Sequence, residues 1–204
     1  LRILMSFAVT KGIGYKGTRS RSMNMDFIDV KKAYLNAAAT RDIYIQLPDE
    51  DHDPGMCGKL KKAMYGTRDG AQHWEEEYMT FTHDLGFVSG SSTPCIFHHP
   101  GRQLRAVVHG DDFTILGYEE ELDWFRNRIQ KKYEVKIAAR LGPEAHDDKE
   151  VRVLNRIVSW SNEGIRYEAD QRHAEIIVRD LGLNQSNGVV TPCEREDLGK
   201  EGSK

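Results

Sequence analysis

The hydrophobic and polar positions in the first third of the chain follow the spacing of β-strands. Residues 25–30 alternate polar and apolar side chains, which predicts a strand that runs into a turn or short helix near Leu35. Residues 42–48 predict a second strand, which is stopped by Pro48. Residues 49–58 are rich in acids and contain Pro and Gly but lack the regular spacing of a calcium loop, so they predict a solvated surface loop.

From Arg68 onward the apolar spacing changes to that of a helix. Apolar residues recur at three- and four-residue steps and stop at Gly86, which predicts an amphipathic helix. Residues 119–133 predict a second helix, and residues 171–181 predict a third that ends at Gly182. The positions expected to face a core in the first two helices are Ala71, Trp74, Tyr78, Phe81 and Leu85, and then Leu122, Phe125, Ile129 and Tyr133.

Two hairpins are predicted among these helices. The β-prone runs 104–108 and 113–116 flank the short polar stretch His109-Gly110-Asp111-Asp112. Residues 151–160 are expected to pair with residues 165–169 across a turn. Because strands and helices are mixed without strict alternation, the expected fold class is α+β, with an antiparallel sheet and helices packed on one face.

Composition narrows the class of protein only slightly. The 204 residues are 30% charged and 39% hydrophobic, as in a soluble globular domain, and no apolar run approaches the ~20 residues of a membrane span. The start lacks a basic leader and a cleavage site, so we expect an intracellular protein that is not secreted, and it lacks an initiator Met, as an internal fragment would. Three distant cysteines (Cys57, Cys95 and Cys193) argue against a disulfide framework.

Net charge gives little support for a nucleic-acid partner. The formal charge is −3, whereas phosphate binding normally calls for a basic surface. Basic residues nevertheless cluster locally, and each cluster is equally consistent with a solvated helix face and with a phosphate contact. The two clusters are Lys59, Lys61, Lys62 and Arg68, and then Arg126, Arg128, Lys131, Lys132, Lys136 and Arg140.

Three aspartates carry the candidate chemistry. Asp29 lies at the end of a predicted strand, and Asp111 and Asp112 lie in a predicted turn. Adjacent carboxylates repel each other unless a cation neutralises them, and Mg²⁺ suits carboxylate oxygens while keeping sites for water and phosphate. An Asp-Asp pair after Gly is also common in ordinary surface turns. A metal site is favoured because both acidic positions lie at the ends of apolar β-runs. Two ions held by these acids could support phosphoryl transfer.

Several segments resemble the reverse transcriptases of copia-type LTR retrotransposons. Residues 29–36 (Asp-Val-Lys-Lys-Ala-Tyr-Leu-Asn) resemble motif A, and residues 43–48 resemble the strand that follows it. Residues 59–74 are similar to the Leu-Lys-Lys-Ser-Leu-Tyr-Gly-Leu-Lys-Gln-Ala-Pro-Arg-x-Trp segment. Residues 108–113 stand where the family has Tyr-Val-Asp-Asp. Further ordered matches are Leu85-Gly86-Phe87, Thr93-Pro94-Cys95-Ile96-Phe97, Gly164-Ile165, Asp180-Leu181-Gly182-Leu183 and Thr191-Pro192, so the likeness covers residues 25–193.

The resemblance implies an RNA-directed DNA polymerase that adds dNTPs to a primer 3′-hydroxyl. It implies that Asp29, Asp111 and Asp112 are catalytic ligands of two Mg²⁺ or Mn²⁺ ions, assisted by the Val30 carbonyl. Tyr34 would be the gate that excludes a 2′-hydroxyl, and Lys136 would protonate pyrophosphate; plain core and surface roles are the alternatives. Arg68 is a further candidate for substrate binding.

The implied partners are an RNA or DNA template-primer, dNTPs and the remainder of a Pol polyprotein, that is, its fingers, RNase H and integrase regions. No membrane partner is implied. The implied location is the cytoplasm, inside a virus-like particle, or the nucleus. We expect residual fingers or a linker over residues 1–24, a palm with motifs A to D over 25–140, and a hairpin plus helix toward the thumb or connection over 141–204. Residues 1–24 read as loop and a short apolar stretch, so the fingers are largely missing.

Some positions depart from the family pattern. Asp69-Gly70-Ala71-Gln72 replaces Gln-Ala-Pro-Arg, which puts an acid near the expected template and removes an Arg. His109-Gly110 replaces Tyr-Val, and residues 146–150 read as an insertion whose Asp147-Asp148 pair is expected to be a solvated turn. Two readings therefore stay open: a polymerase palm that is feeble on its own, or a catalytically dead remnant that binds nucleic acid at most. A palm-fold nucleotide cyclase or RNA-copying polymerase fits Tyr34 and the motif order less well.

Overall fold

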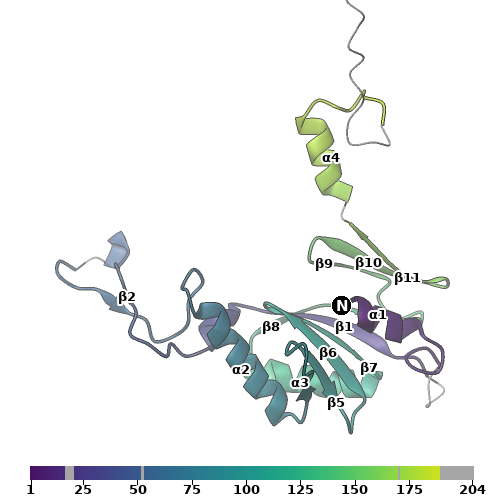
Figure 1. Cartoon of the computed structure of the whole chain (residues 1–204), viewed down its shortest axis with the longest axis horizontal. Helices are drawn as coiled ribbons and strands as arrows, with labels where there is room; N and C mark the ends of the chain where they lie inside the picture. The colour runs from purple at the N-terminus through teal and green to yellow at the C-terminus, as the bar shows by residue number, and fades with distance from the viewer. Residues whose placement is uncertain (17–20, 52, 170, 189–204) are drawn as a thin grey trace, which may run out of the picture. The chain divides into compact units, whose positions relative to one another are not determined.

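The computed structural model describes residues 1–16, 21–51, 53–169 and 171–188 (Figure 1). The chain divides into two compact units, Leu1–Glu168 and Ala169–Lys204. The first unit begins with α1 (Arg2–Val9), β1 (Asn24–Val30) and the 3₁₀ turn η1 (Ala33–Asn36). A two-stranded ribbon follows, made of β2 (Tyr44–Ile45) and β3 (Gly58–Lys59), with the 3₁₀ turn η2 (Asp49–Asp51) between them.

The main structural element is a six-stranded antiparallel sheet. Its strand order is β4-β5-β6-β7-β1-β8, and every neighbouring pair is antiparallel. The strands are β4 (Val88–Ser89), β5 (Ile96–His99), β6 (Leu104–His109), β7 (Asp112–Gly117) and β8 (Val135–Leu141), together with β1. The predicted α+β class with an antiparallel sheet is confirmed, and β1 lies between β7 and β8.

Two helices cover one face of this sheet. They are α2 (Gly70–Asp84) and α3 (Glu119–Lys132), and both were predicted. Acidic residues occupy the first turn of α3 and basic residues its last turn, which suits the helix dipole. The core beneath these helices contains Ile28, Val30, Trp74, Tyr78, Phe81, Phe113, Leu122, Phe125, Ile129 and Tyr133. The predicted core positions therefore hold, except that Ala71 is exposed and Leu85 is only half-buried.

The opposite face of the sheet is also covered, which the sequence pattern did not predict. Residues 1–24 were expected to be loop and a short apolar stretch, yet residues 2–9 form α1, whose Leu4, Met5 and Ala8 pack into a second core. A three-stranded sheet of β9 (Glu150–Val153), β10 (Arg156–Ser161) and β11 (Gly164–Ala169) adds Val151, Val158 and Trp160 to this core. Where α1 and this small sheet pack on the six-stranded sheet, side chains on both faces of its strands are buried.

The central strand β1 also buries a charge, on the face that α3 covers. Asp26 is 1% exposed and accepts paired hydrogen bonds from the guanidinium groups of Arg126 and Arg140, with N–O distances of 2.6–3.0 Å. Arg140 also contacts Asp123 at 2.8 Å. Two members of the second basic cluster thus hold the sheet to α3.

Two further predictions on the segment after β8 were wrong. Residues 151–160 form two strands, not one, because Leu154 and Asn155 make a two-residue turn with φ of +49° and +56°. Asp147 is not solvated: its side chain is buried and accepts hydrogen bonds from Asn24 Nδ2 at 2.6 Å and from the Glu144 amide at 2.8 Å. The turn thereby ties this segment to the start of β1.

The second unit contains α4 (Gln171–Asp180), close to the predicted bounds, followed by Gly182 with φ of +68°. The Thr191-Pro192 match and Cys193 lie outside the described residues, while Cys57 and Cys95 are free thiols. Within the described part of the chain, no helix combines the length and the apolar character that a membrane crossing requires.

In the first unit, the ribbon strand β2 is shorter than the predicted strand over residues 42–48.

Candidate metal centre

The turn between β6 and β7 places two of the three candidate aspartates. His109 pairs with Asp112 across the strands, so Gly110 and Asp111 are the two residues of the turn. Gly110 has φ of +63°, whereas Asp111 does not have a positive φ. This combination is that of a type II′ turn, one of the two turns that match the twist of a β-hairpin and one that favours Gly at its first central position. The glycine that replaces the family's Val therefore suits its backbone conformation.

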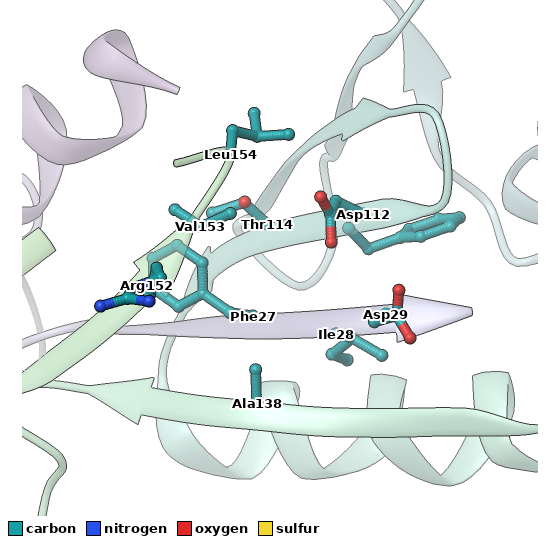
Figure 2. A pocket seen from close by; sticks show the side chains of 10 residues that line it. Phe27, Ile28, Asp29, Asp112, Thr114, Ala138, Arg152, Val153 and Leu154 are labelled. Atoms are coloured by element: carbon teal, nitrogen blue, oxygen red, sulfur yellow. The ribbon is translucent and has the colours of Figure 1, made fainter. Parts of the chain in front are cut away.

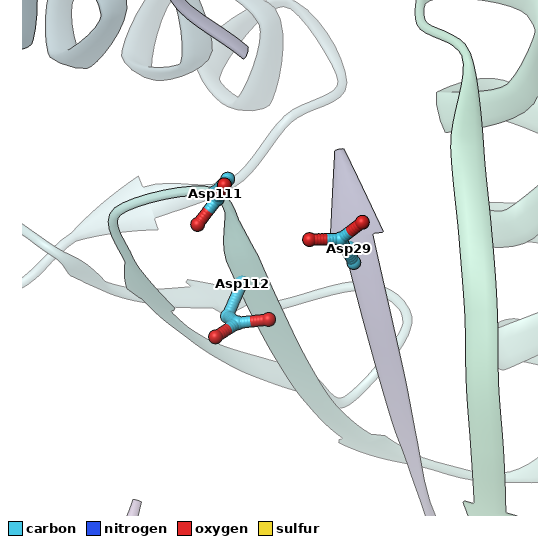
Figure 3. Close-up of side chains that lie close together, drawn as sticks. All are labelled: Asp29, Asp111 and Asp112. Carbon is cyan, nitrogen blue, oxygen red and sulfur yellow. The ribbon is translucent and has the colours of Figure 1, made fainter. Parts of the chain in front are cut away.

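The third aspartate comes from the neighbouring strand. Asp29 is the antiparallel partner of Asp112 in the β1–β7 register. Ile28 and Phe113 point into the core beneath α2 and α3, so the adjacent Asp29 and Asp112 point to the opposite face of the sheet. Figure 3 shows Asp111 and Asp112 on the hairpin opposite Asp29 near the end of β1.

The three carboxylates converge closely enough to share a cation. One carboxylate oxygen from each residue lies within 4.8 Å of the others, and all three residues are half-buried. Among the described residues, this is where three potential metal ligands gather, and the Asp147-Asp148 pair takes no part in it. Burial raises the pKa of Asp112, and the negative charges of Asp111 and Asp29 raise it further. A hard divalent cation would relieve this repulsion, so the donor set fits Mg²⁺ or Mn²⁺.

Two hydrogen bonds to backbone carbonyl oxygens hold the turn that carries Asp111. The indole Nε1–H of Trp74, on α2, donates to the carbonyl oxygen of Gly110 at 2.8 Å. The amide of Val30, on β1, donates to the carbonyl oxygen of Asp111 at 3.0 Å. The turn is therefore fixed both to the helix layer and to the strand that carries Asp29.

A small cavity of about 110 Å³ adjoins the carboxylates on this face (Figure 2). Asp29 and Asp112 line one end of it, and Arg152 of β9 and Leu154 of the turn that follows line another part. In the figure the Arg152 guanidinium points away from the two carboxylates. The cavity thus leaves open space beside the carboxylate oxygens.

Lys136 lies in the same row as the acids. It is the antiparallel partner of Asp29 in the β1–β8 register, so its side chain emerges on the same face of the sheet, and it is exposed. Val30 is fully buried and its amide is used by the turn. The predicted role of its carbonyl oxygen as an ion ligand stays a prediction.

Tyr34 lies in η1, just after β1. Its ring stacks on Tyr65 with centroids 4.2 Å apart and planes 9° from parallel. Gly70 at the start of α2 lies close to the same ring, since an added Cβ would lie 3.2 Å from Tyr34 Cδ2. The ring is half-buried and held by the segment that precedes α2, as a sugar gate would need to be.

Arg68 is exposed in the loop before α2. The neighbouring Asp69, expected to add negative charge near the template, forms a two-point ion pair with the guanidinium of Arg41. Hydrogen bonding by Arg41 lowers the pKa of Asp69 and raises that of Arg41. The charge introduced by this departure is therefore balanced by a neighbouring residue.

Sequence reasoning missed three contributions to the site. Trp74 was predicted only as core, and the signal that could have found it is the Trp at the end of the motif in residues 59–74. Tyr65 belongs to the same motif, but nothing local indicates that it stacks on Tyr34. The turn at Leu154 was hidden because it contains no glycine.

Comparison with known proteins agrees with the motifs. A family model described as "Reverse transcriptase (RNA-dependent DNA polymerase)" matches residues 18–195. The chain is 29% identical over 136 residues to the retrovirus-related Pol polyproteins of transposons RE2 and RE1 from Arabidopsis thaliana, covering 61% of this chain and 9% of each relative. It is 24% identical over 181 residues to that of transposon TNT 1-94 from Nicotiana tabacum, covering 85% of this chain and 13% of the relative. The chain thus spans a small part of the length of these relatives. It belongs to the reverse transcriptase family and corresponds to the reverse transcriptase region of LTR retrotransposons, as its copia-type motifs predicted.

Proposed function

We propose that this chain provides the catalytic palm of an RNA-directed DNA polymerase, acting on a primer 3′-hydroxyl and a dNTP within a longer Pol polyprotein. The observation that carries the proposal is the convergence of Asp29, Asp111 and Asp112, with one oxygen from each within 4.8 Å. Two strands from distant parts of the sequence bring them together on one face of the sheet. That arrangement favours a metal site over three unrelated surface acids.

The three carboxylates would hold two divalent ions between them. Ions bound there would lower the pKa of the attacking hydroxyl and offset charge on the reacting and departing phosphate oxygens. The helix-covered face is closed by packed aromatics, so template-primer and nucleotide would reach the carboxylates from the opposite face, beside the segment that carries Arg152 and Leu154. The cavity beside Asp29 and Asp112 leaves space for reacting groups there.

The other proposed roles fall on residues around this centre. The stacked ring of Tyr34 would press against the sugar of the incoming nucleotide and leave no space for a 2′-hydroxyl. The ammonium of Lys136, in the same row as Asp29, would hold and donate a proton to pyrophosphate. Arg68, exposed before α2, would contact the nucleotide or template.

A metal titration followed by primer extension tests the proposal. Mg²⁺ or Mn²⁺ should raise the melting temperature of the chain, and an Asp111→Asn/Asp112→Asn double variant should lose this response. Primer extension is then measured on a longer chain that includes the preceding fingers segment, since we expect the 204 residues alone to be feeble. Equal metal responses in parent and variant would favour the alternative, a non-catalytic module that binds nucleic acid at most.

A further inference from the structure

We propose that Trp74 is a positioning residue for the carboxylate centre: its indole N–H sets the orientation of the turn peptide and, through it, the direction of Asp111. This inference rests on the proposed metal site and identifies a residue outside it that controls its geometry. The hydrogen bond from Nε1 to the Gly110 carbonyl oxygen is 2.8 Å long. Trp74 is 1% exposed, whereas Gly110 is exposed, so a buried helix residue reaches outward to hold an exposed turn.

The hydrogen bond acts on the part of the turn that defines its type. Types I′ and II′ differ mainly in the orientation of their central peptide, and with it in φ of the second residue. In this turn the central peptide carries the Gly110 carbonyl, and the second residue is Asp111. Holding that carbonyl toward Trp74 therefore keeps the type II′ form and keeps Asp111 out of the left-handed region.

The indole is itself held in one orientation. Its ring makes edge-to-face contacts with Tyr78, at a centroid distance of 5.6 Å, and with Tyr133, at 5.3 Å. All three rings belong to the core beneath α2 and α3. A donor fixed in a packed core restrains its acceptor more strongly than a mobile surface side chain does, because little further entropy is lost.

A second hydrogen bond, from the Val30 amide, acts together with that of Trp74 to fix the turn beside Asp29. The Val30 amide holds the Asp111 carbonyl, so both turn carbonyls are bound from outside the hairpin. Three carboxylates this close repel each other, and an unrestrained turn would let Asp111 move away from Asp29 when no cation is bound. Trp74 keeps the site formed before the ion arrives, so its loss should weaken metal binding beyond any effect on folding.

The test compares Trp74→Phe with Trp160→Phe in the 204-residue chain. Both changes remove an indole from a buried position, but Trp160 belongs to the second core, and the donor to the Gly110 carbonyl is Trp74. Mn²⁺ affinity is measured by isothermal titration calorimetry, and metal-free stability by urea unfolding. We expect Trp74→Phe to weaken Mn²⁺ binding about tenfold, as changes around metal ligands do, and Trp160→Phe to leave it within about twofold. In an Asp111→Asn background, Trp74→Phe should have little further effect on Mn²⁺ affinity.

Each outcome separates this inference from the proposed function. Parental Mn²⁺ binding that is unchanged by Trp74→Phe, or weakened equally by both Trp variants, would overturn the inference and leave the proposed function standing. A parent that binds no Mn²⁺ would overturn both. If Trp74→Phe does not fold, the ¹⁵N-indole resonances of the parent decide: the Trp74 resonance should shift with Mg²⁺ while that of Trp160 stays in place, and an unmoved Trp74 resonance would refute the inference.

Discussion

Neutralising one acid of the candidate metal centre should stabilise the metal-free protein. Asp112→Asn removes the repulsion of Asp112 with Asp29 and with Asp111, which are the two charges that raise its pKa in addition to burial. The oxygens lie within 4.8 Å of one another. At that separation one pair of charges costs about 1 kcal/mol in a water-like dielectric and about 3.5 kcal/mol at an effective dielectric of 20.

The half-buried position of these groups favours the lower part of that range. Two pairs then give a gain of about 2 kcal/mol, or about 4–8 °C in melting temperature for a domain of this size. A raised folded-state pKa means that the folded protein is favoured when Asp112 is protonated. The parent therefore has its full stability below the unfolded value of 3.8 and loses this contribution as the pH rises through the higher folded-state pKa. The advantage of Asp112→Asn should be greatest at pH 7 and vanish below about pH 4.

Thermal unfolding followed by circular dichroism in EDTA, from pH 4 to pH 7, measures this effect. Asp49→Asn is the matched control, because it makes the same charge change in an exposed loop. Added Mg²⁺ should reverse the order at about a hundred times the Kd of the parent, where the parent gains about 2.7 kcal/mol while Asp112→Asn, which lacks one ligand, gains much less. A metal-free Asp112→Asn protein that melts at or below the temperature of the parent at pH 7 would refute the reasoning.

Three other substitutions test separate parts of the structure. Gly110→Val places a β-branched residue at φ of +63°, so urea unfolding should show a loss of about 1–3 kcal/mol; an unchanged midpoint would mean that the turn adopts another form. Asp26→Asn leaves Arg126 and Arg140 without their buried carboxylate and should cost about 3–5 kcal/mol in the same assay, whereas a loss below about 1 kcal/mol would contradict the buried ion-pair interpretation. In a longer chain that extends primers, Tyr34→Val should raise ribonucleotide incorporation at least about tenfold relative to dNTP and Tyr34→Phe should not, and equal discrimination in both variants would exclude the sugar-gate role.

Local sequence patterns were enough to predict β1, α2, the β6–β7 hairpin, α3 and the positions of the three acids, whereas α1, β4, β5 and β8 were not predicted. The hairpin around Asp111 and Asp112 follows from two β-prone runs flanking a short polar stretch, and α2 and α3 follow from the apolar spacing along each helix. Asp29 could be located because a strand pattern ends there. These signals are local, since a few neighbouring side chains decide which face of a strand or helix is buried.

Contacts between distant segments could not be read in this way. The sequence shows Asp26 as a polar residue of an alternating strand, but its burial depends on two arginines from α3 and β8. Asp147 looks like a residue of a solvated turn until the fold brings Asn24 to it. In both cases the partners are separated by a hundred residues or more, and only the tertiary fold brings them together.

The sequence by itself therefore determined the family, the principal helices and strands, and which aspartates carry the candidate chemistry. The tertiary structure alone decided that Asp29 pairs with Asp112 in the β1–β7 register, that both faces of the sheet are covered, and that Trp74 reaches the Gly110 carbonyl. The physical reason is that secondary structure responds to the periodicity of nearby side chains, whereas a site is formed by the register of strands and the packing of a helix on them. Those features depend on the whole set of long-range contacts, which no local window of the sequence contains.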